Sequence, residues 1–301
     1  ELDKNAELRD KMIDSDEFLS SVNYNLIYTI NINREKILKS INESKIEKRD
    51  LDRKLEKRIK KVSSFTESKI GVSNSWIAKD DKGNKLGIFK RAVTERNFYR
   101  PFIKQGSLYK NDLASYRLDR IFNFDIVPPT TITELNGYIG SFQYWKNDFK
   151  NFEVVNNIKD DLLFFSDVTG KELFKMNFLD FLLENTDRHI NNFLINYDES
   201  EIAAIDNSLS FPEGPTDHFV LDEDFFLHGT DDGEIEEIFK DFLTKEKIEL
   251  MKNELYNSGL LSEQSIKRLL SRLRYLAKHH KNGKNIDKLK KFYKYSECTV
   301  D

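Results

Sequence analysis

Three oxygen-bearing side chains surround one short predicted hairpin. Asp187 follows a strongly apolar segment, Asn192 comes just before the run FLIN, and Asp206 follows the run IAAI. The polar stretch YDESE separates the two runs, which predicts antiparallel strands joined by a turn. Because the outer ends of a hairpin lie side by side, Asn192 and Asp206 are expected to meet. Mg²⁺ prefers such oxygen ligands, and an aspartate that binds no metal can accept the proton of an attacking hydroxyl.

The spacing of these residues is the one that kinases use for phosphoryl transfer. There, a catalytic Asp is followed five positions later by a metal-binding Asn, and a hairpin returns a second metal-binding Asp. In this chain the two separations are five and fourteen residues. A polar surface hairpin would explain each residue alone, so the interpretation depends on the three residues together.

Residues upstream offer the other groups that nucleotide binding requires. Lys90 ends a hairpin predicted over 74–91, in which DKGN supplies the turn. Asp112 begins a helix predicted over 111–122, where it could orient the lysine or simply cap the helix. Candidate phosphate donors lie just before the hairpin: Ser73, Asn74 and Ser75. Each has an ordinary structural explanation, and their order along the chain favours the functional one.

Helical and strand-forming regions alternate along the chain. Residues 7–61 are predicted to be mostly helical, and strand signals run from Pro128 to Trp145. Residues 170–187 are apolar nearly all round, which predicts a buried central helix. A further helix with one apolar face is predicted over 263–281. The order predicts an α+β fold.

These motifs resemble those of the phosphatidylinositol 3-/4-kinase superfamily, in particular the type II phosphatidylinositol 4-kinases and their bacterial relatives. GVSNSWIAKDDKGNKLGIFK is similar to that family's serine-rich phosphate loop and lysine strand, and VPPT and GSFQ are similar to its strands before the hinge. NTDRHINNFLI and AIDNSLSFP are similar to its catalytic and metal motifs. DLASYRLDRIF also resembles the atypical secretory-pathway protein kinases, which have Glu at the position of Asp112. The likeness covers about residues 70–212.

The resemblance implies a bilobal protein-kinase-like fold with extra helical N-terminal and C-terminal segments. Its parts would be a helical extension over 1–66, an N-lobe over 67–145 and a helical C-lobe over 146–301. ATP with Mg²⁺ or Mn²⁺ would be the cofactors. The implied roles are Asp187, Lys90 and Asp112 for catalysis, Ser73, Asn74, Ser75 and Lys90 for the phosphates, Gln143, Tyr144 and Trp145 for the adenine-binding hinge, and Asn192 and Asp206 for the metal. Three positions depart from the family pattern: Asp112 is shorter than Glu, Arg91 replaces a proline, and Ser208 replaces a glycine.

An acidic segment suggests the substrate class. Residues 213–239 contain ten Asp or Glu and no Lys or Arg. One explanation is a solvated acidic loop without a specific function. Beside an active site, however, its negative charge would repel an anionic lipid head group and favour a basic protein. The sequence therefore favours transfer to a protein Ser or Thr hydroxyl. A phosphatidylinositol 4-kinase-like lipid kinase and a pseudokinase scaffold are the alternatives.

A basic segment near the C-terminus suggests an anionic ligand. Residues 267–294 contain eleven Lys or Arg against one acid, Asp287. The segment could be a solvated surface, a patch for nucleic acid or acidic lipid, or a pocket for an inositol polyphosphate or phosphoinositide head group that activates the enzyme. The apolar face of helix 263–281 is predicted to direct its basic residues away from the core. The residues assigned to this anion site are Lys267, Arg268, Arg272, Arg274, Lys278, His279, Lys281 and Lys284.

The composition limits the class of protein. The chain has 301 residues, 33% of them charged, and a net charge of only −4, so a soluble globular protein without a nucleic-acid partner is expected. One cysteine, Cys298, excludes an internal disulfide framework and predicts a reducing, cytoplasmic compartment. No run of 18 apolar residues occurs, so no membrane span is expected. The Lys- and Asn-rich composition leaves open secretion into a host cell as an effector.

Overall fold

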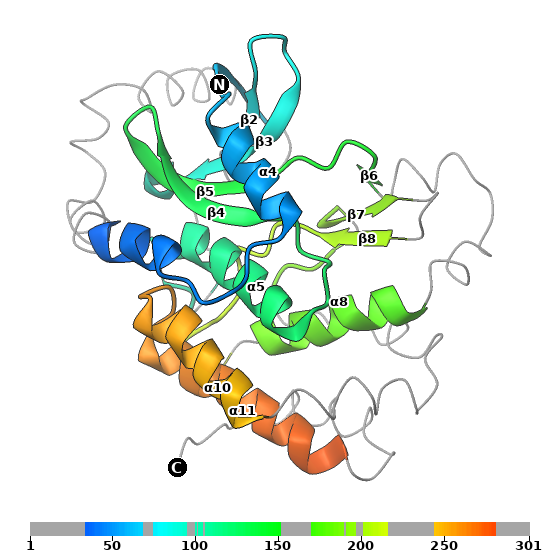
Figure 1. Cartoon of the computed structure of the whole chain (residues 1–301). Coiled ribbons are helices and arrows are strands. Elements are labelled where there is room, and N and C mark those ends of the chain that lie inside the picture. The colour runs from blue at the N-terminus through cyan, green and yellow to red at the C-terminus, as the bar shows by residue number, and fades with distance from the viewer. Residues whose placement is uncertain are drawn as a thin grey trace, which may run out of the picture.

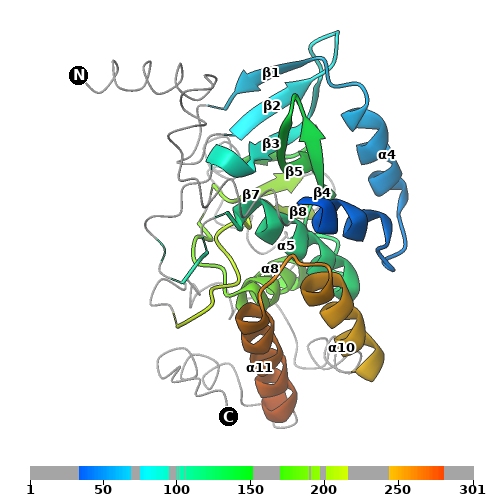
Figure 2. The same cartoon turned by 90° about the vertical axis from the view of Figure 1, so that its left-hand side faces the viewer.

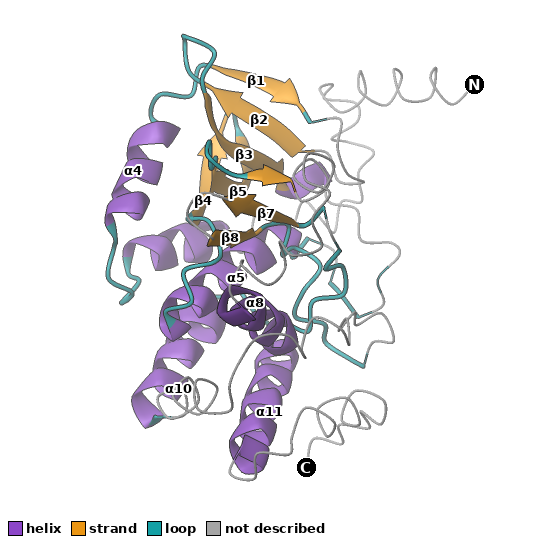
Figure 3. Cartoon of the chain, turned by 90° about the vertical axis from the view of Figure 1, so that its right-hand side faces the viewer, coloured by secondary structure: helices purple, strands orange, loops and turns teal. Residues whose placement is uncertain are grey.

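The computed structural model describes residues 34–68, 75–94, 100, 102–104, 106–151, 170–189, 191–196, 201–215 and 244–280. Within these ranges a strand-rich region lies above a helical region, as Figures 1 and 3 show. The predicted α+β class is confirmed, and the mixture of elements is consistent with a kinase-like fold.

A five-stranded antiparallel sheet forms the upper region (Figure 2). The strand order is β1-β2-β3-β5-β4. The strands are β1 (Ser64–Glu67), β2 (Ser75–Lys79), β3 (Lys85–Arg91), β4 (Thr130–Leu135) and β5 (Tyr138–Tyr144). The 3₁₀-helix η1 (Ala92–Thr94) follows β3. The strand signals between Pro128 and Trp145 are confirmed as β4 and β5, whereas β1 was not predicted.

The turn between β2 and β3 follows from its sequence. The carboxylate of Asp80 accepts the backbone N–H groups of Lys82 and Asn84 at 3.0 and 2.8 Å. Gly83 has φ +82°, a conformation that costs glycine little. The hairpin predicted over 74–91 is therefore confirmed for its described residues, and it places Lys90 beside Ser75 in the strand register.

The described part of the N-terminal region packs on this sheet. Residues 34–42 are helical, and α4 (Asp50–Ile59) follows after a break. Buried Leu55 of α4 joins a small apolar core with Ala78, Leu86, Phe89 and Phe142. Arg58 donates to the backbone oxygens of Leu86 and Trp145 at 3.1 and 2.9 Å. α4 is thus fastened to the sheet by both apolar and polar contacts.

The helix α5 (Leu108–Phe122) connects the two regions. Every residue of α5 is buried. It packs on β4 and β5, and also on α10 (Lys245–Met251) and the π-helix η2 (Lys252–Asn257). Arg117 of α5 pairs with buried Glu254 of η2 at 3.4 Å. The helix predicted over 111–122 is confirmed, and it begins three residues earlier.

The lower region holds a small sheet and a central helix. β6 (Lys150–Asn151), β7 (Phe193–Asn196) and β8 (Glu201–Ala204) form a three-stranded sheet, in which β7 and β8 are the hairpin predicted from the sequence. α8 (Gly170–Leu183) is buried over 176–183, and α11 (Glu263–His280) packs against it. α8 ends before the predicted Asp187 because Glu184 takes a left-handed conformation, φ +51°. None of the helices in the described ranges combines the length and apolar character that a membrane span needs.

A buried carboxyl group in α5 is expected to make the stability of the fold depend on pH. Asp119 has no exposed surface, and its Oδ1 accepts the backbone N–H of Ile126 at 3.1 Å. Its Oδ2 has no hydrogen-bond partner among the described residues. Burial raises the pKa of Asp119 to about 7 because the charged form is poorly solvated there.

We therefore expect Asp119→Asn to flatten the pH dependence of stability. The folded state holds the Asp119 proton up to about pH 7, whereas the unfolded chain releases it near the ordinary pKa of 3.8. Wild-type stability should fall as pH rises between these values, by on the order of 1.4 kcal/mol per pH unit, and level off above. Urea unfolding of both proteins at pH 5 and pH 8 measures this. If the free energy of unfolding changed equally between pH 5 and pH 8 in the two proteins, the result would contradict a protonated Asp119.

Candidate active site

Lys90 of β3 lies between two carboxylates. Its Nζ is 3.2 Å from Asp112 Oδ2 and 2.7 Å from Asp206 Oδ1. The Lys90 side chain is 17% exposed, Asp112 only 4%, and Asp206 35%. These side chains come from a strand of the upper sheet, from α5 and from the segment after β8. The structure thus brings together three residues that the sequence places far apart.

The charges of these groups depend on one another. Burial alone would lower the pKa of Lys90, but the two carboxylates outweigh it and raise that pKa above its ordinary value. Burial would raise the pKa of Asp206, and the nearby Lys90 ammonium outweighs it and lowers that pKa. For the more deeply buried Asp112, burial prevails and its pKa is raised. At neutral pH the cluster holds a firmly protonated lysine and an ionised Asp206.

The position of Asp112 in its helix differs from the prediction. Because α5 begins at Leu108, Asp112 does not begin or cap the helix but lies in its second turn. Ser141 of β5 donates its hydroxyl to Asp112 Oδ2 at 2.9 Å. The shorter side chain of aspartate still reaches Lys90, because α5 packs directly against β5. The substitution of Glu by Asp is therefore compatible with the lysine pair.

The Asp206 side chain is set by its local backbone. Asp206 has φ +52°, and Ser208 donates its hydroxyl to Asp206 Oδ1 at 3.0 Å. Ser208 is not among the described residues with positive φ, so this position does not require glycine. Asn111 of α5 donates to the carbonyls of Ser208 and Ser210 at 2.9 and 2.8 Å. The segment after β8 is therefore anchored to the helix that carries Asp112.

Asp187 and Asn192 contact each other in the turn before β7. Asn192 Nδ2 donates to the Asp187 carbonyl at 2.7 Å and lies 3.4 Å from Asp187 Oδ2. Arg188 between them is buried and pairs with Asp180 of α8 at 2.8 Å. It also donates to the carbonyl of Ile205 at 2.8 Å, next to Asp206. This arginine ties both ends of the hairpin to the central helix.

Arg100 is a site residue that the sequence analysis missed. Its guanidinium lies 2.7 Å from Asp187 Oδ1, and the two side chains are 25% and 27% exposed. No local pattern indicates this contact, because Arg100 belongs to the stretch between η1 and α5, outside every recognised motif. The contact engages one oxygen of Asp187. The other oxygen, Oδ2, faces Asn192 and, at 4.0 Å, the ring of His189.

The donor set suits a divalent cation that also binds phosphate. Because the Asn192 amide nitrogen donates to Asp187, its oxygen is the atom available to a metal. Asp206 Oδ1 accepts from Lys90 and Ser208, so a metal bound here would use the second oxygen of this carboxylate. In the described ranges, no group of three or more His, Cys, Asp or Glu could hold a metal alone. Two protein oxygens completed by phosphates and water fit Mg²⁺ bound with a nucleotide.

The other predicted nucleotide contacts are only partly described. Ser75 is buried at the start of β2, opposite Lys90, whereas Ser73 and Asn74 lie outside the described residues. Gln143 and Tyr144 end β5, and the backbone N–H of Trp145 still donates to the Leu86 carbonyl of β3 at 3.2 Å. Gln143 donates its amide to Thr130 Oγ1 at 3.0 Å, so its side chain is already held within the sheet. Tyr144 and Trp145 lie under the cationic groups of Arg58 and Lys85, at 3.7 and 4.4 Å from the ring centres.

The predicted orientation of the basic C-terminal helix is wrong for two residues. Arg268 and Arg272 are buried, and both pair with Glu184 after α8, Arg268 at 2.6 Å. Arg272 also donates to the Leu182 carbonyl at 3.0 and 2.8 Å. These guanidiniums face the core because both pair with the buried Glu184 carboxylate, and Arg272 also donates to a buried carbonyl.

The structure describes the side chains of only some of the other residues assigned to the predicted anion site. Lys267 is exposed and pairs with Glu263 at 2.8 Å. Arg274 is exposed. The side chains of Lys278 and His279, and the whole of Lys281 and Lys284, lie outside the described part of the chain.

Comparison with known families identifies a match over the middle and C-terminal part of the chain. The family model described as phosphatidylinositol 3- and 4-kinase matches residues 121–270. The matched region includes Asp187, Asn192 and Asp206, whereas Lys90 and Asp112 precede it. No curated protein matches the chain closely enough to count as a relative.

Proposed function

Because the chain belongs to the phosphatidylinositol 3- and 4-kinase superfamily, and so to a family of kinases, we propose that it transfers the γ-phosphoryl group of ATP to a Ser or Thr hydroxyl of a protein. The observation that carries the proposal is the contact of Lys90 with both Asp112 and Asp206, at 3.2 and 2.7 Å. The hairpin that leads to Asp206 begins at Asn192, whose side chain contacts Asp187.

The proposed roles follow from the charges of these side chains. Lys90 binds the nucleotide phosphates, and Asp112 holds its ammonium in place. Asn192 and Asp206 would hold Mg²⁺ or Mn²⁺, which neutralises charge on the phosphates when it is bound. In the structure described here Lys90 donates directly to Asp206. Nucleotide binding therefore requires Lys90 to redirect its hydrogen bonds from Asp206 to phosphate oxygens.

Asp187 is the proposed general base. Its Oδ1 is engaged by Arg100, so Oδ2 is the oxygen offered to the substrate hydroxyl. A base must lie within hydrogen-bond reach of the proton that it removes. The Asn192 amide holds the Asp187 backbone carbonyl at 2.7 Å, so Asn192 would position Asp187 in addition to its proposed role as a metal ligand.

The choice of a protein acceptor rests on the acidic segment over 213–239. Most of it lies outside the described residues, so its charge alone supports the proposal. A lipid acceptor is the second candidate, because the matching family is described by its phosphatidylinositol substrates. A pseudokinase scaffold is the third, and the presence of all the proposed phosphotransfer residues disfavours it.

Fewer residues remain available for the activator site that the sequence predicts in the C-terminal basic segment. Since Arg268 and Arg272 are committed to Glu184, an inositol polyphosphate there would depend on Lys267, Arg274 and the residues that follow. A role as a secreted effector in host cytoplasm stays a proposal from composition alone.

Labelled ATP separates the three candidates. The protein is incubated with [γ-³²P]ATP and either a mixture of basic proteins or phosphatidylinositol vesicles. We expect label in protein and little in lipid. Label in phosphatidylinositol alone would favour the lipid kinase, and ATP binding without label in either acceptor would favour the scaffold.

Lys90→Met tests the lysine cluster. Methionine keeps an unbranched apolar stem but removes the cation that Asp112 and Asp206 share. We expect kcat/KM for ATP to fall by about a hundredfold or more, because a phosphate-binding charge is lost. Stability should fall more at pH 8 than at pH 5, since the two carboxylates repel each other when ionised. Wild-type kinetics in this variant would remove Lys90 from the proposed site.

A further inference from the structure

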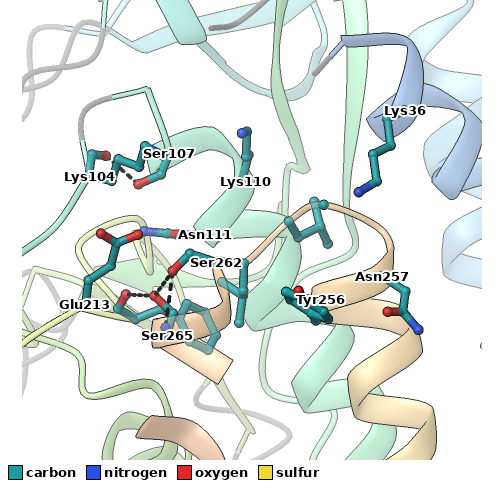
Figure 4. Close-up of a pocket in the computed structure, with 14 residues that line it drawn as sticks. Lys36, Lys104, Ser107, Lys110, Asn111, Glu213, Tyr256, Asn257, Ser262 and Ser265 are labelled. Atoms are coloured by element: carbon teal, nitrogen blue, oxygen red, sulfur yellow. Dashed lines mark hydrogen bonds between the residues drawn. The ribbon is translucent and has the colours of Figure 1, made fainter. Parts of the chain in front are cut away.

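A cavity that is not lined by Lys90, Asp112 or Asp206 lies between α5, η2 and the helix over 34–42. Its volume is about 360 Å³, at the small end of the range for small-molecule sites. Figure 4 shows residues from four separate stretches of chain around it. Its charged lining residues are Lys36, Lys104, Lys110 and Glu213. Among the described lining residues the cavity therefore carries an excess of two positive charges.

The three lysines are held in place by different elements. Lys36 extends from its helix toward the cavity, and Lys104 and Ser107 appear on the opposite side of the view (Figure 4). A Cβ at Gly259 would lie 3.4 Å from Lys36 Cδ, in ordinary van der Waals contact, so the Lys36 stem passes beside this residue. Gly259 has φ +80°, a backbone conformation that favours glycine. Lys110 is buried in the first turn of α5.

The rest of the lining adds hydrogen-bonding groups. Ser107 precedes α5, and the first turn of α5 contains no acidic residue. The positive end of the helix dipole therefore adds to the lysine charges. Ser262 and Asn257 also line the cavity, where the Ser262 hydroxyl donates to Ser265 Oγ at 3.2 Å and the Asn257 amide donates to Asn253 Oδ1 at 2.7 Å. Lysine ammoniums, hydroxyls and a helix N-terminus are groups that bind phosphate.

We propose that this cavity binds a small phosphate-bearing ligand, separate from the nucleotide, and that the ligand regulates phosphoryl transfer. The regulatory part rests on the kinase function proposed above. The phosphate groups could belong to a free polyphosphate or to a lipid head group, and both present the same chemistry to the three lysines.

The cavity is lined by two of the elements that bring Lys90, Asp112 and Asp206 together, namely α5 and the segment after β8, which supplies Phe211 and Glu213. Lys110 and Asn111 precede Asp112 on the same rigid helix, and Asn111 also holds the backbone after Asp206 through Ser208 and Ser210. Lys104 lies four residues after Arg100, whose guanidinium pairs with Asp187. A ligand bound by these lysines would thus restrain α5 and the stretch that carries Arg100. Both restraints act on groups proposed for catalysis.

Binding of tripolyphosphate tests the site without any need for kinase activity. Isothermal titration is performed on the whole chain without ATP, and on the double variant Lys36→Gln/Lys104→Gln. Both lysines are exposed, so the variant should fold normally. We expect its binding to be weaker by about a hundredfold, at about tenfold for each lysine. The matched control is Lys54→Gln/Lys57→Gln, which removes two exposed lysines from α4 and should bind as the wild type does.

Two further arms identify the site and the source of the phosphate. Lys90→Met should keep the binding, whereas loss of all binding in Lys90→Met would show that only the nucleotide site binds the probe and would overturn the proposal. Equal affinity of the Lys36/Lys104 variant and its control would also overturn it. Flotation with phosphatidylcholine vesicles, with and without phosphatidylinositol 4-phosphate, tests the lipid source. Lipid-dependent flotation that requires Lys36 and Lys104 supports a head-group ligand, whereas a wild type that neither binds tripolyphosphate nor floats in this way would overturn the proposal.

The regulatory part has its own measurement. Phosphoryl transfer is measured with and without the ligand that binds, in the wild type and in Lys36→Gln/Lys104→Gln. We expect the ligand to change the wild-type rate and to leave the variant's rate unchanged at the same concentration. Binding with no change in the wild-type rate would overturn the regulatory part and leave the anion site. No transfer under any condition, with binding intact, would instead count against the proposed kinase function.

Discussion

Asp206→Asn is expected to lower kcat/KM for phosphoryl transfer by about a thousandfold or more. The substitution removes a proposed metal ligand and one of the two carboxylates that contact Lys90. Several kcal/mol of transition-state stabilisation depend on such a metal, and each ~1.4 kcal/mol corresponds to a factor of ten in rate. Steady-state kinetics over a range of Mg²⁺ concentrations measures the loss. Part of the activity should return at high Mg²⁺ if weaker metal binding is the cause.

Ser208→Ala is the matched control for this variant. It removes the hydroxyl that donates to Asp206 Oδ1 at 3.0 Å but keeps the carboxylate and its charge. We expect a loss of about tenfold or less, which corresponds to one ordinary hydrogen bond. If Ser208→Ala and Asp206→Asn were equally impaired, the orientation of this segment, and not metal ligation, would account for both results.

Glu184→Gln is expected to destabilise the protein by about 3–5 kcal/mol. Glu184 is buried and pairs with both Arg268 and Arg272. Its replacement by a neutral amide leaves two buried guanidiniums without a compensating charge, which costs far more than an exposed pair is worth. Urea unfolding at neutral pH measures the difference. In a protein in which Arg268 and Arg272 are both replaced by methionine, Glu184→Gln should lower the free energy of unfolding much less.

Glu263→Gln provides the comparison on the same helix. Glu263 pairs with Lys267 at 2.8 Å, but these side chains are 64% and 49% exposed. Water and salt screen such a pair, so we expect little measurable change in the unfolding midpoint. Similar losses in Glu184→Gln and Glu263→Gln would contradict the burial of the arginine pair.

Local sequence signals were sufficient to predict the elements that hold the candidate site. The turn before β3 is fixed by Asp80 and Gly83, both within the turn itself. The two apolar runs around YDESE pair as β7 and β8, which places Asn192 and Asp206 at the same end of that hairpin. Each of these features depends on residues that are close in sequence, so the chain's own pattern reveals it.

The sequence pattern could not predict contacts between segments that lie far apart in the chain. Helical periodicity identified the apolar face of α11, but the burial of Arg268 depends on Glu184, 84 residues away. The Arg100–Asp187 pair joins residues 87 apart, and no motif includes Arg100. Residues next to an apolar stripe can be either exposed or buried, and only the partner on another helix decides between the two.

The cavity beside α5 shows the same limitation for binding sites. Clustering of charge along the sequence pointed to the C-terminal segment as the anion site. The cavity is instead lined by Lys36, Lys104 and Lys110, of which Lys36 belongs to the basic stretch 34–61 and the other two belong to no basic run. Tertiary packing collects them, so charge density along the chain could not reveal the cavity.

Transfer of labelled γ-phosphate from ATP by the wild type and by Asp187→Ala tests the central claim most directly. Both proteins are assayed with the same protein acceptor, with Mg²⁺ or Mn²⁺ and with a chelator, after circular dichroism has shown that both are folded. The proposed site predicts metal-dependent transfer by the wild type and a loss of several orders of magnitude in Asp187→Ala. Equal transfer by the two proteins, or wild-type transfer that persists in the chelator, would contradict a site built from Lys90, Asp187, Asn192 and Asp206.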